Sequence, residues 1–105
     1  MIIAVDYDGT LFDAGKINRG LIAQLRQAQR NGDTVILWTC REGRRLTEAL
    51  DALHRAGFHP QFVNCNAPEA VRRLHHDPRK IFADLYIDDK AVQAWKSAKR
   101  AGSDT

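Results

Sequence analysis

Residues 2–11, with the sequence IIAVDYDGTL, carry the pattern that decides the fold. A short apolar run rich in β-branched residues is typical of a buried strand, and this run ends in two carboxylates. Because successive strand residues face opposite sides, Asp6 and Asp8 share one side and Tyr7 faces the other. Gly9 supplies the conformational freedom that the turn after the strand requires. A polar turn after an edge strand is the plainer interpretation of the same residues, and the stretch alone leaves it open.

If this strand is central in a parallel sheet, Asp6 and Asp8 lie at its carboxyl end, where open α/β sheets bind ligands. Two carboxylates held this close repel each other unless a cation or a shared proton relieves them. A hard divalent cation with oxygen ligands, such as Mg²⁺, is the natural relief. The stretch therefore indicates a metal-dependent site at one edge of a sheet.

Strand and helix patterns alternate along the rest of the chain. Further strands are expected at residues 34–39, 61–63 and 82–87. Helices are expected from the Asn18 N-cap to residue 31, from about residue 43 to 57, from 67 to 77 and from 91 to 100. Short loops between alternating strands and helices predict an α/β fold, with a parallel sheet and helices on both of its faces.

Size and composition indicate one soluble domain. The chain has 105 residues, of which 44% are hydrophobic and 28% are charged, as in an ordinary globular protein. The net charge of +3 suits phosphorylated or polyanionic ligands. Two cysteines, Cys40 and Cys65, do not make a disulfide scaffold, so a cytoplasmic location is expected. No apolar stretch approaches the length of a membrane span, so no contact with a membrane is expected.

Polar residues recur where the expected strands end. Asp6 and Asp8 end the first strand, Thr39 ends the second, and Asp88 and Asp89 follow the last. The carboxyl ends of parallel strands meet at one edge, so these groups would converge if the strands are neighbours. Lys80, just before the last strand, can bring a positive charge to the same edge.

These motifs, in this order, resemble those of the haloacid dehalogenase-like (HAD) superfamily of phosphatases and phosphotransferases. Asp6-x-Asp8-Gly9-Thr10 is similar to motif I and Thr39 to motif II, while Lys80 is similar to motif III and Asp88-Asp89 to motif IV. The match covers nearly the whole chain. It implies that residues 1–105 form a single HAD-like catalytic domain, with a three-layer Rossmann-like sheet, and that the protein is a Mg²⁺-dependent phosphomonoester hydrolase.

The resemblance also implies catalytic roles. Asp6 would be the nucleophile that forms an aspartyl-phosphate, and Asp8 would protonate the leaving alcohol and then activate water. Thr39 would bind phosphoryl oxygens, and Lys80 would neutralise charge on Asp6 and the phosphate. Arg79 competes with Lys80 for the latter role, and Thr39 could instead be a strand-end residue that caps the next helix.

Metal and substrate ligands follow from the same resemblance. Mg²⁺ would be held by the carboxylates of Asp6 and Asp88 and the backbone carbonyl of Asp8. Asp89 would orient a metal-bound water or Lys80. The candidate substrate contacts are the backbone amides after Asp8, at Gly9 and Thr10, and the side chain of Arg41.

Neither usual insertion point for a cap domain has room for one, since residues 11–16 and the segment before Lys80 are short. The resemblance therefore implies a capless member with an open site, which accepts bulky substrates or is covered by another subunit of a homo-oligomer. Small phosphorylated metabolites, nucleotides and the phosphorylated end of a polynucleotide are all candidate substrates.

Other interpretations accompany these. A phosphorylatable module, or a partner-binding protein of the same fold without turnover, is the alternative to a phosphatase. Trp38 is expected to be core, and both cysteines are expected to be packed and inert. His75 and His76 are expected to be surface histidines because adjacent residues rarely direct two imidazoles at one ion. Arg44 and Arg45 are either solvated or bind a second phosphate.

Overall fold

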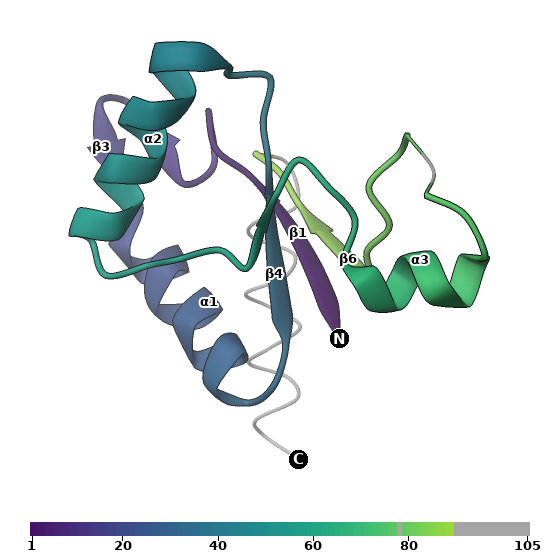
Figure 1. Ribbon diagram of the computed structural model, residues 1–105. Helices are drawn as coiled ribbons and strands as arrows, with labels where there is room; N and C mark the ends of the chain where they lie inside the picture. Colours follow the sequence, from purple (N-terminus) through teal and green to yellow (C-terminus); the bar gives the residue numbers. More distant parts are fainter. Residues whose placement is uncertain (78, 90–105) are drawn as a thin grey trace.

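Four short parallel strands form the sheet around which the chain is built (Figure 1). The computed structural model describes residues 1–77 and 79–89. Across the sheet the order is β5 (Phe62–Val63), β4 (Thr34–Trp38), β1 (Ile2–Asp6) and β6 (Leu85–Ile87). The Asp-x-Asp strand, β1, thus lies between two neighbours rather than at an edge, so the interpretation as an edge-strand turn is wrong.

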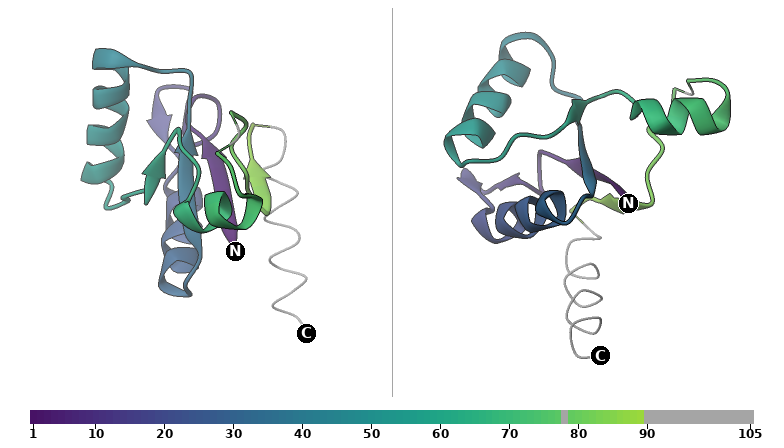
Figure 2. Two further views of the ribbon diagram at one scale, coloured as in Figure 1. Left: turned by 45° about the vertical axis from the view of Figure 1, so that its right-hand side comes forward. Right: turned by 60° about the horizontal axis from the view of Figure 1, so that its bottom comes forward.

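Helices pack on both faces of this sheet, as the alternating pattern predicts. Helices α1 (Arg19–Arg30) and α2 (Gly43–Arg55) cover one face, and the short α3 (Pro68–Leu74) lies over the other (Figure 2). Residues Ile3 and Val5 of β1 belong to the core under α1 and α2, whereas Ile2 belongs to the smaller core under α3. None of the helices described in the two ranges is long and apolar enough to span a membrane.

Helix α1 shows how closely local sequence dictates local structure here. The Asn18 side chain accepts a hydrogen bond from the Leu21 N–H at 3.1 Å and caps the helix, as the sequence predicts. The expected apolar face is fully covered, at Leu21, Ile22, Leu25 and Ala28. The helix ends before Asn31 and Gly32, where Gly32 has a φ of 95° that favours glycine.

A small antiparallel hairpin, β2 (Phe12–Asp13) with β3 (Lys16–Ile17), fills what the sequence suggested was a plain connection. Its turn passes through Ala14 and Gly15, both with positive φ. The Asn18 N–H donates to the Leu11 carbonyl at 2.7 Å, so the hairpin returns the chain to the end of β1 before α1 begins.

The third helix and the last strand are clearly shorter than predicted, while the other expected elements within the described residues differ by a residue or two at their ends. The third helix ends at Leu74, not residue 77, because His75 adopts a left-handed conformation (φ 63°). The last strand begins at Leu85, not residue 82, because the backbone before it is bonded to side chains: the Phe82 N–H donates to Asn66 and the Ala83 N–H donates to the Tyr86 hydroxyl. The expected helix at 91–100, with Val92 and Trp95, lies outside the described residues, as do Pro78 and Lys90.

Strand β6 is tied to β1 by a reciprocal contact with Asp84. The Asp84 carboxylate accepts a hydrogen bond from the Ile2 N–H at 2.7 Å, and the Asp84 N–H donates to the Ile2 carbonyl at 2.8 Å. This pairing begins the register in which Ile3 lies beside Leu85 and Val5 beside Ile87. The register fixes which residues meet at the other end of the two strands.

Asn66→Ala tests the support of the segment that leads into β6. The nearly buried Asn66 side chain donates to Asp77 and to the Lys80 carbonyl and accepts from the Phe82 N–H. Its loss leaves these groups unpaired, and the free energy of unfolding should fall by about 1–3 kcal/mol in urea denaturation. Gln27→Ala, on the exposed face of α1, should change it by less than about 0.5 kcal/mol. Equal effects of the two variants would contradict the assignment.

Candidate functional site

Acidic residues from opposite ends of the chain meet where β1 and β6 leave the sheet. Because Val5 pairs with Ile87, the residues that follow, Asp6 and Asp88, emerge side by side. On the other flank Asp6 pairs with Trp38, so Thr39 follows at the same edge. The sheet therefore brings together the strand-end residues that the sequence singled out.

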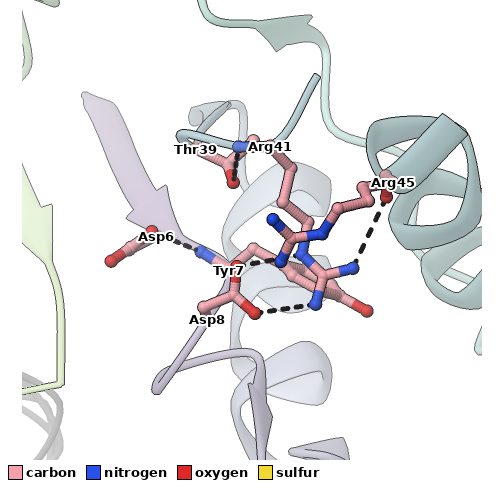
Figure 3. Close-up of polar contacts among 6 residues, drawn as sticks. All are labelled: Asp6, Tyr7, Asp8, Thr39, Arg41 and Arg45. Carbon is pink, nitrogen blue, oxygen red and sulfur yellow. Dashed lines mark hydrogen bonds and ion pairs between the residues drawn. The ribbon is translucent and has the colours of Figure 1, made fainter. Parts of the chain in front are cut away.

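The pKa of Asp6 reflects its burial and the acidic residues that surround it. Burial is the main reason that the pKa of Asp6 is raised, and the charges of Asp8, Asp88 and Asp89 raise it further. A hydrogen bond from the Tyr7 N–H to Asp6 Oδ1, at 2.8 Å, acts in the opposite direction (Figure 3). Three carboxylates thus act on a fourth at one edge of the sheet.

Gly9 brings the turn after β1 against the acidic residues that follow β6. It has a φ of 79°, which favours glycine, and a Cβ built on it would lie 3.5 Å from the Cβ of Asp89. Asp89 therefore lies beside the Asp-x-Asp turn. Within residues 1–77 and 79–89 no ion pair joins Asp89 to Lys80, so no contact supports the expectation that Asp89 orients this lysine.

Arg41 is paired with Asp8 rather than left for a substrate. Its Nε and Nη2 donate to the two oxygens of Asp8 at 2.9 and 2.8 Å, in a bidentate pair (Figure 3). The guanidinium lies over the Tyr7 ring, 4.8 Å from its centroid, and Tyr7 stacks on Phe12. The hydrogen bond from Arg41 lowers the pKa of Asp8, whose side chain is 51% exposed.

Sequence reasoning identified Arg41 but not this pairing. The sequence did indicate part of this arrangement, because the strand alternation placed Tyr7 on the opposite side from Asp6, and Tyr7 is indeed buried there. What the sequence could not give is that β4 lies next to β1, which brings the loop after Thr39 over the Tyr7 ring.

Thr39 does not cap α2, because the N-cap of that helix is Glu42. Its Oγ1 accepts a hydrogen bond from the Arg41 N–H at 3.1 Å, and its own N–H donates to Asn64 Oδ1 at 2.7 Å. Asn64, which sequence reasoning missed, has a φ of 54°, a conformation that asparagine tolerates better than most residues. The sequence feature that could have identified Asn64 is its position directly after a short strand. Thr39 thus supports the Arg41 loop and keeps a hydroxyl proton to donate.

The backbone amides after Asp8 are already used within the turn. The Gly9 N–H donates to the Phe12 carbonyl and the Thr10 N–H to the Tyr7 carbonyl. The Thr10 side chain is only 2% exposed. The expectation that Gly9 and Thr10 bind phosphoryl oxygens through these amides is therefore wrong for the structure as it stands, because a closed turn consumes both donors.

Lys80 lies in the wall of a cavity. The cavity, of about 280 Å³, is named here the Trp38–Tyr86 pocket, and it is lined by Trp38, Arg79, Lys80, Ile81 and Tyr86. The Lys80 Nζ is 5.8 Å from the centroid of the Tyr86 ring. Within the described ranges no ion pair joins Lys80 or Arg79 to Asp6, so the structure does not choose between them.

Trp38 is a wall of this pocket and not a core residue. Its side chain is half-buried, and its buried indole Nε1 has no hydrogen-bond partner among the described residues. The continuous apolar pattern of residues 34–38 suggested core, but Trp38 lies at the strand end, beyond the three fully buried residues Val35, Ile36 and Leu37.

The remaining candidates lie on the surface. Cys40 and Cys65 are both exposed free thiols, so the expectation that they are packed is wrong, because both fall in loops at the sheet edge. His75 and His76 are exposed, with His75 as the C-cap of α3. Arg44 and Arg45 are exposed in the first turn of α2, and the Arg45 carbonyl accepts a long hydrogen bond from Arg41.

The acidic edge offers oxygen ligands of the kind that Mg²⁺ prefers. Among residues 1–77 and 79–89, no three His, Cys, Asp or Glu side chains are grouped to hold a metal ion. The expected set needs only two side chains, Asp6 and Asp88, with the main-chain carbonyl of Asp8, whose carboxylate is turned to Arg41. Burial is the main reason that the pKa of Asp6 is raised, and the smaller contribution from neighbouring carboxylates is a repulsion that a hard cation relieves, so the donor set fits Mg²⁺.

Comparison with solved structures finds a conserved protein from Bacteroides thetaiotaomicron that is 34% identical to this chain, with a TM-score of 0.74. The match covers 89% of this chain and 78% of that protein. The chain belongs to the same family as this protein. Family membership supports the α/β fold, and because the relative is described only as a conserved protein, it assigns no activity. No protein-family model and no curated protein matches the chain.

A double-mutant cycle with Asp8→Asn and Arg41→Met tests the ion pair. Because Asp8 is half exposed, the coupling free energy should be modest, about 0.5–1 kcal/mol at low salt, and should fall as salt is added. The folded pKa of Asp8 is lowered, so the coupling is present at neutral pH and is lost as the pH falls through that pKa. Unfolding of the four proteins in urea gives the coupling, and a value of zero at low salt would contradict the pair.

Proposed function

We propose that the protein is a Mg²⁺-dependent phosphomonoester hydrolase of the haloacid dehalogenase-like superfamily. One observation carries the proposal: β1 lies between β4 and β6, and Asp6 and Asp88 leave adjacent strands at the same edge. Asp8 and Thr39 lie at this edge too, in the motif order of that superfamily. A phosphomonoester dianion could not approach such a cluster without a cation, which explains the requirement for metal.

In the first step Asp6 acts as the nucleophile. A carboxylate oxygen attacks phosphorus in line, an O–P bond forms, and the ester P–O bond breaks. Asp8, in its protonated form at this step, gives its proton to the leaving alkoxide, which departs as the alcohol and leaves Asp8 as a carboxylate. The Tyr7 N–H donates to Asp6 Oδ1 and thereby holds the carboxylate in one orientation at the end of β1.

In the second step water clears the aspartyl-phosphate. Asp8 accepts a proton from the water, whose oxygen attacks phosphorus while the bond from phosphorus to the Asp6 oxygen breaks. Inorganic phosphate leaves, Asp6 is again a carboxylate, and Asp8 keeps the proton that it took from water and can give it to the next leaving group. The hydroxyl of Thr39 donates to a phosphoryl oxygen, while its oxygen continues to support the Arg41 loop.

Bound Mg²⁺ would shield the negative charges of Asp6 and the phosphate from each other. Asp6, Asp88 and the Asp8 carbonyl would hold it, and Asp89, beside Gly9, would orient a water ligand.

Arg41 gives Asp8 two states in this scheme. In the structure the bidentate pair favours the ionised form of Asp8 and holds its carboxylate toward Arg41. A phosphate group presents the same pair of acceptor oxygens to a guanidinium, so an arriving substrate competes for Arg41. Release of Asp8 then leaves it next to the leaving group, where it can carry a proton.

The site is proposed to be open, without a cap domain. The insert after the first motif is the β2–β3 hairpin, which consists of two-residue strands. A second copy of the chain could cover such a site in a homo-oligomer, and light scattering at working concentration would show a monomer if it does not. Exposed, unpaired Cys40 and Cys65 suit a reducing cytoplasm.

The alternative, a phosphorylatable protein without turnover, is favoured by one observation. If Arg41 keeps Asp8 in the bidentate pair throughout, no base activates water, and the aspartyl-phosphate persists. Treatment with acetyl phosphate and Mg²⁺, followed by intact-mass spectrometry over time, separates the two. A hydrolase loses the added phosphoryl group quickly, while the alternative keeps it for hours.

Removal of each acid should have a different kinetic effect. Asp6→Asn should reduce turnover of aryl phosphates below detection, because the nucleophile is lost. Asp8→Asn should lower the rate about 10²-fold for alkyl phosphates and much less for p-nitrophenyl phosphate, whose leaving group needs no proton. Steady-state assays of released phosphate give both. Asp51→Asn, on the exposed side of α2, is the matched control and should retain wild-type rates.

Metal binding should depend on the two ends of the chain together. Isothermal calorimetry of the wild type should show one Mg²⁺ site, and either Asp6→Asn or Asp88→Asn should weaken it at least tenfold, because each removes a carboxylate ligand. Asp51→Asn should leave the affinity unchanged. Undiminished Mg²⁺ binding in Asp88→Asn would show that β6 contributes no ligand and would contradict the proposed centre.

A further inference from the structure

The Trp38–Tyr86 pocket lies on the same face of the sheet as the Asp6 side chain. Residues alternate along each strand, and Ile2 and Ile36 belong to the core under α3, so Asp6 and Trp38 lie on that face as well. On β6, Ile87 packs under α1 and α2, which places Tyr86 on the α3 face. Because Asp6 pairs with Trp38 across β1 and β4, one wall of the pocket is the direct neighbour of the proposed nucleophile in the sheet.

The walls of the pocket are flat and apolar. Trp38 and Tyr86 supply two aromatic surfaces from strands on either side of β1, and Ile81 supplies an aliphatic one. Tyr86 is 37% exposed, and its hydroxyl is bonded to the backbone of Ile81 and Ala83, which holds the ring in place. Such walls suit a planar ring, which stacks on aromatic side chains.

The rim of the pocket carries positive charge. Arg79 and Lys80 are exposed neighbours, and neither forms an ion pair with a carboxylate among the described residues. The Lys80 ammonium lies near the Tyr86 ring rather than near an acid. A ring seated in the pocket therefore has two cations beside it that can pair with an anionic group of the same ligand.

We propose that the Trp38–Tyr86 pocket selects phosphomonoesters whose leaving group carries a planar ring and a second negative charge, as in a nucleoside bisphosphate. This inference rests on the proposed function, which places the reacting phosphate at Asp6. The ring lies between Trp38 and Tyr86, and the second phosphate lies against Arg79 and Lys80. With about 280 Å³, the pocket is just below the usual range for small-molecule sites, so it takes one ring system and leaves the remainder of the ligand at the open edge.

Four substrates separate the two recognition elements. Adenosine 3′,5′-bisphosphate has both the ring and the second charge, adenosine 5′-monophosphate has the ring alone, fructose 1,6-bisphosphate has the second charge alone, and glycerol 3-phosphate has neither. In the wild type, kcat/KM should be highest for adenosine 3′,5′-bisphosphate, and each element should contribute about tenfold. Equal kcat/KM values for all four substrates would overturn the inference.

Pocket variants should remove one preference at a time. Trp38→Leu should abolish the preference for adenosine 5′-monophosphate over glycerol 3-phosphate, whereas Trp38→Phe, which keeps an aromatic wall, should retain most of it. Arg79→Gln should reduce the preference for fructose 1,6-bisphosphate over glycerol 3-phosphate. Arg72→Gln, an exposed cation on α3 outside this pocket, should change neither ratio. Because each readout is a ratio, general damage to catalysis cancels.

An equilibrium measurement keeps this inference separable from the proposed reaction. Calorimetric titration of the Asp6→Asn protein with adenosine 3′,5′-bisphosphate should show binding that weakens about tenfold when Trp38→Leu is added. Binding of this kind without any turnover by the wild type would sustain the pocket and overturn the phosphatase. Turnover of all four substrates with no effect of Trp38→Leu on binding or selectivity would overturn the pocket and leave the phosphatase standing. A 5′-phosphorylated oligonucleotide that binds more tightly than the bisphosphate would identify a polymer end as the source of the ring and the second phosphate.

Discussion

The parallel pairing of β1 with β6 is the constraint on which the rest of the structure depends. It joins residues 3–5 to residues 85–87, so the first and last described strands lie side by side, with β1 inside the sheet and β6 at the edge of its described part. Asp84 locks one end of the pair to Ile2, and Val5 beside Ile87 sets the other. A shift of one residue in this register would turn Ile87 away from the main core and move Asp88 away from Asp6. Burial of the apolar residues thus places the acids.

The same constraint gathers negative charge that the fold only partly relieves. The Tyr7 N–H supports one oxygen of Asp6, and Arg41 neutralises Asp8 over a base of two stacked aromatic rings. Burial raises the pKa of Asp6, and the charges of Asp8, Asp88 and Asp89 raise it further. A bound hard cation would relieve the repulsion among these carboxylates.

Elements governed by nearby sequence were the predictable ones. The Asn18 cap, the apolar face of α1 and the alternation along β1 depend on residues within one or two turns, so the pattern alone specifies them. The ends of α3 and β6 depend instead on His75 and on the Asn66 contacts to the backbone of residues 80–82, which no local pattern contains. The hairpin was missed because its two-residue strands are too short to show a period.

For the site, sequence order was enough to nominate Asp6, Asp8, Thr39 and Asp88, because parallel strands share one edge. Sequence order could not predict which side chains of different loops contact each other. The pairing of Arg41 with Asp8 requires β4 to lie beside β1, and the pocket at Trp38 requires residues 79–81, from the segment before β6, to form its other walls together with Tyr86. The backbone amides of Gly9 and Thr10 were misjudged because the sequence shows a turn but not which carbonyls it satisfies.

The most direct test of the central claim is nuclear magnetic resonance with Mn²⁺ in place of Mg²⁺. If Asp6 and Asp88 share one ion, substoichiometric Mn²⁺ should broaden the amide signals of residues 6–9 and of residues 88–89 in parallel, and excess Mg²⁺ should restore both sets together. Broadening of one set without the other, or at clearly different Mn²⁺ concentrations, would contradict a shared centre and with it the proposed phosphoryl chemistry.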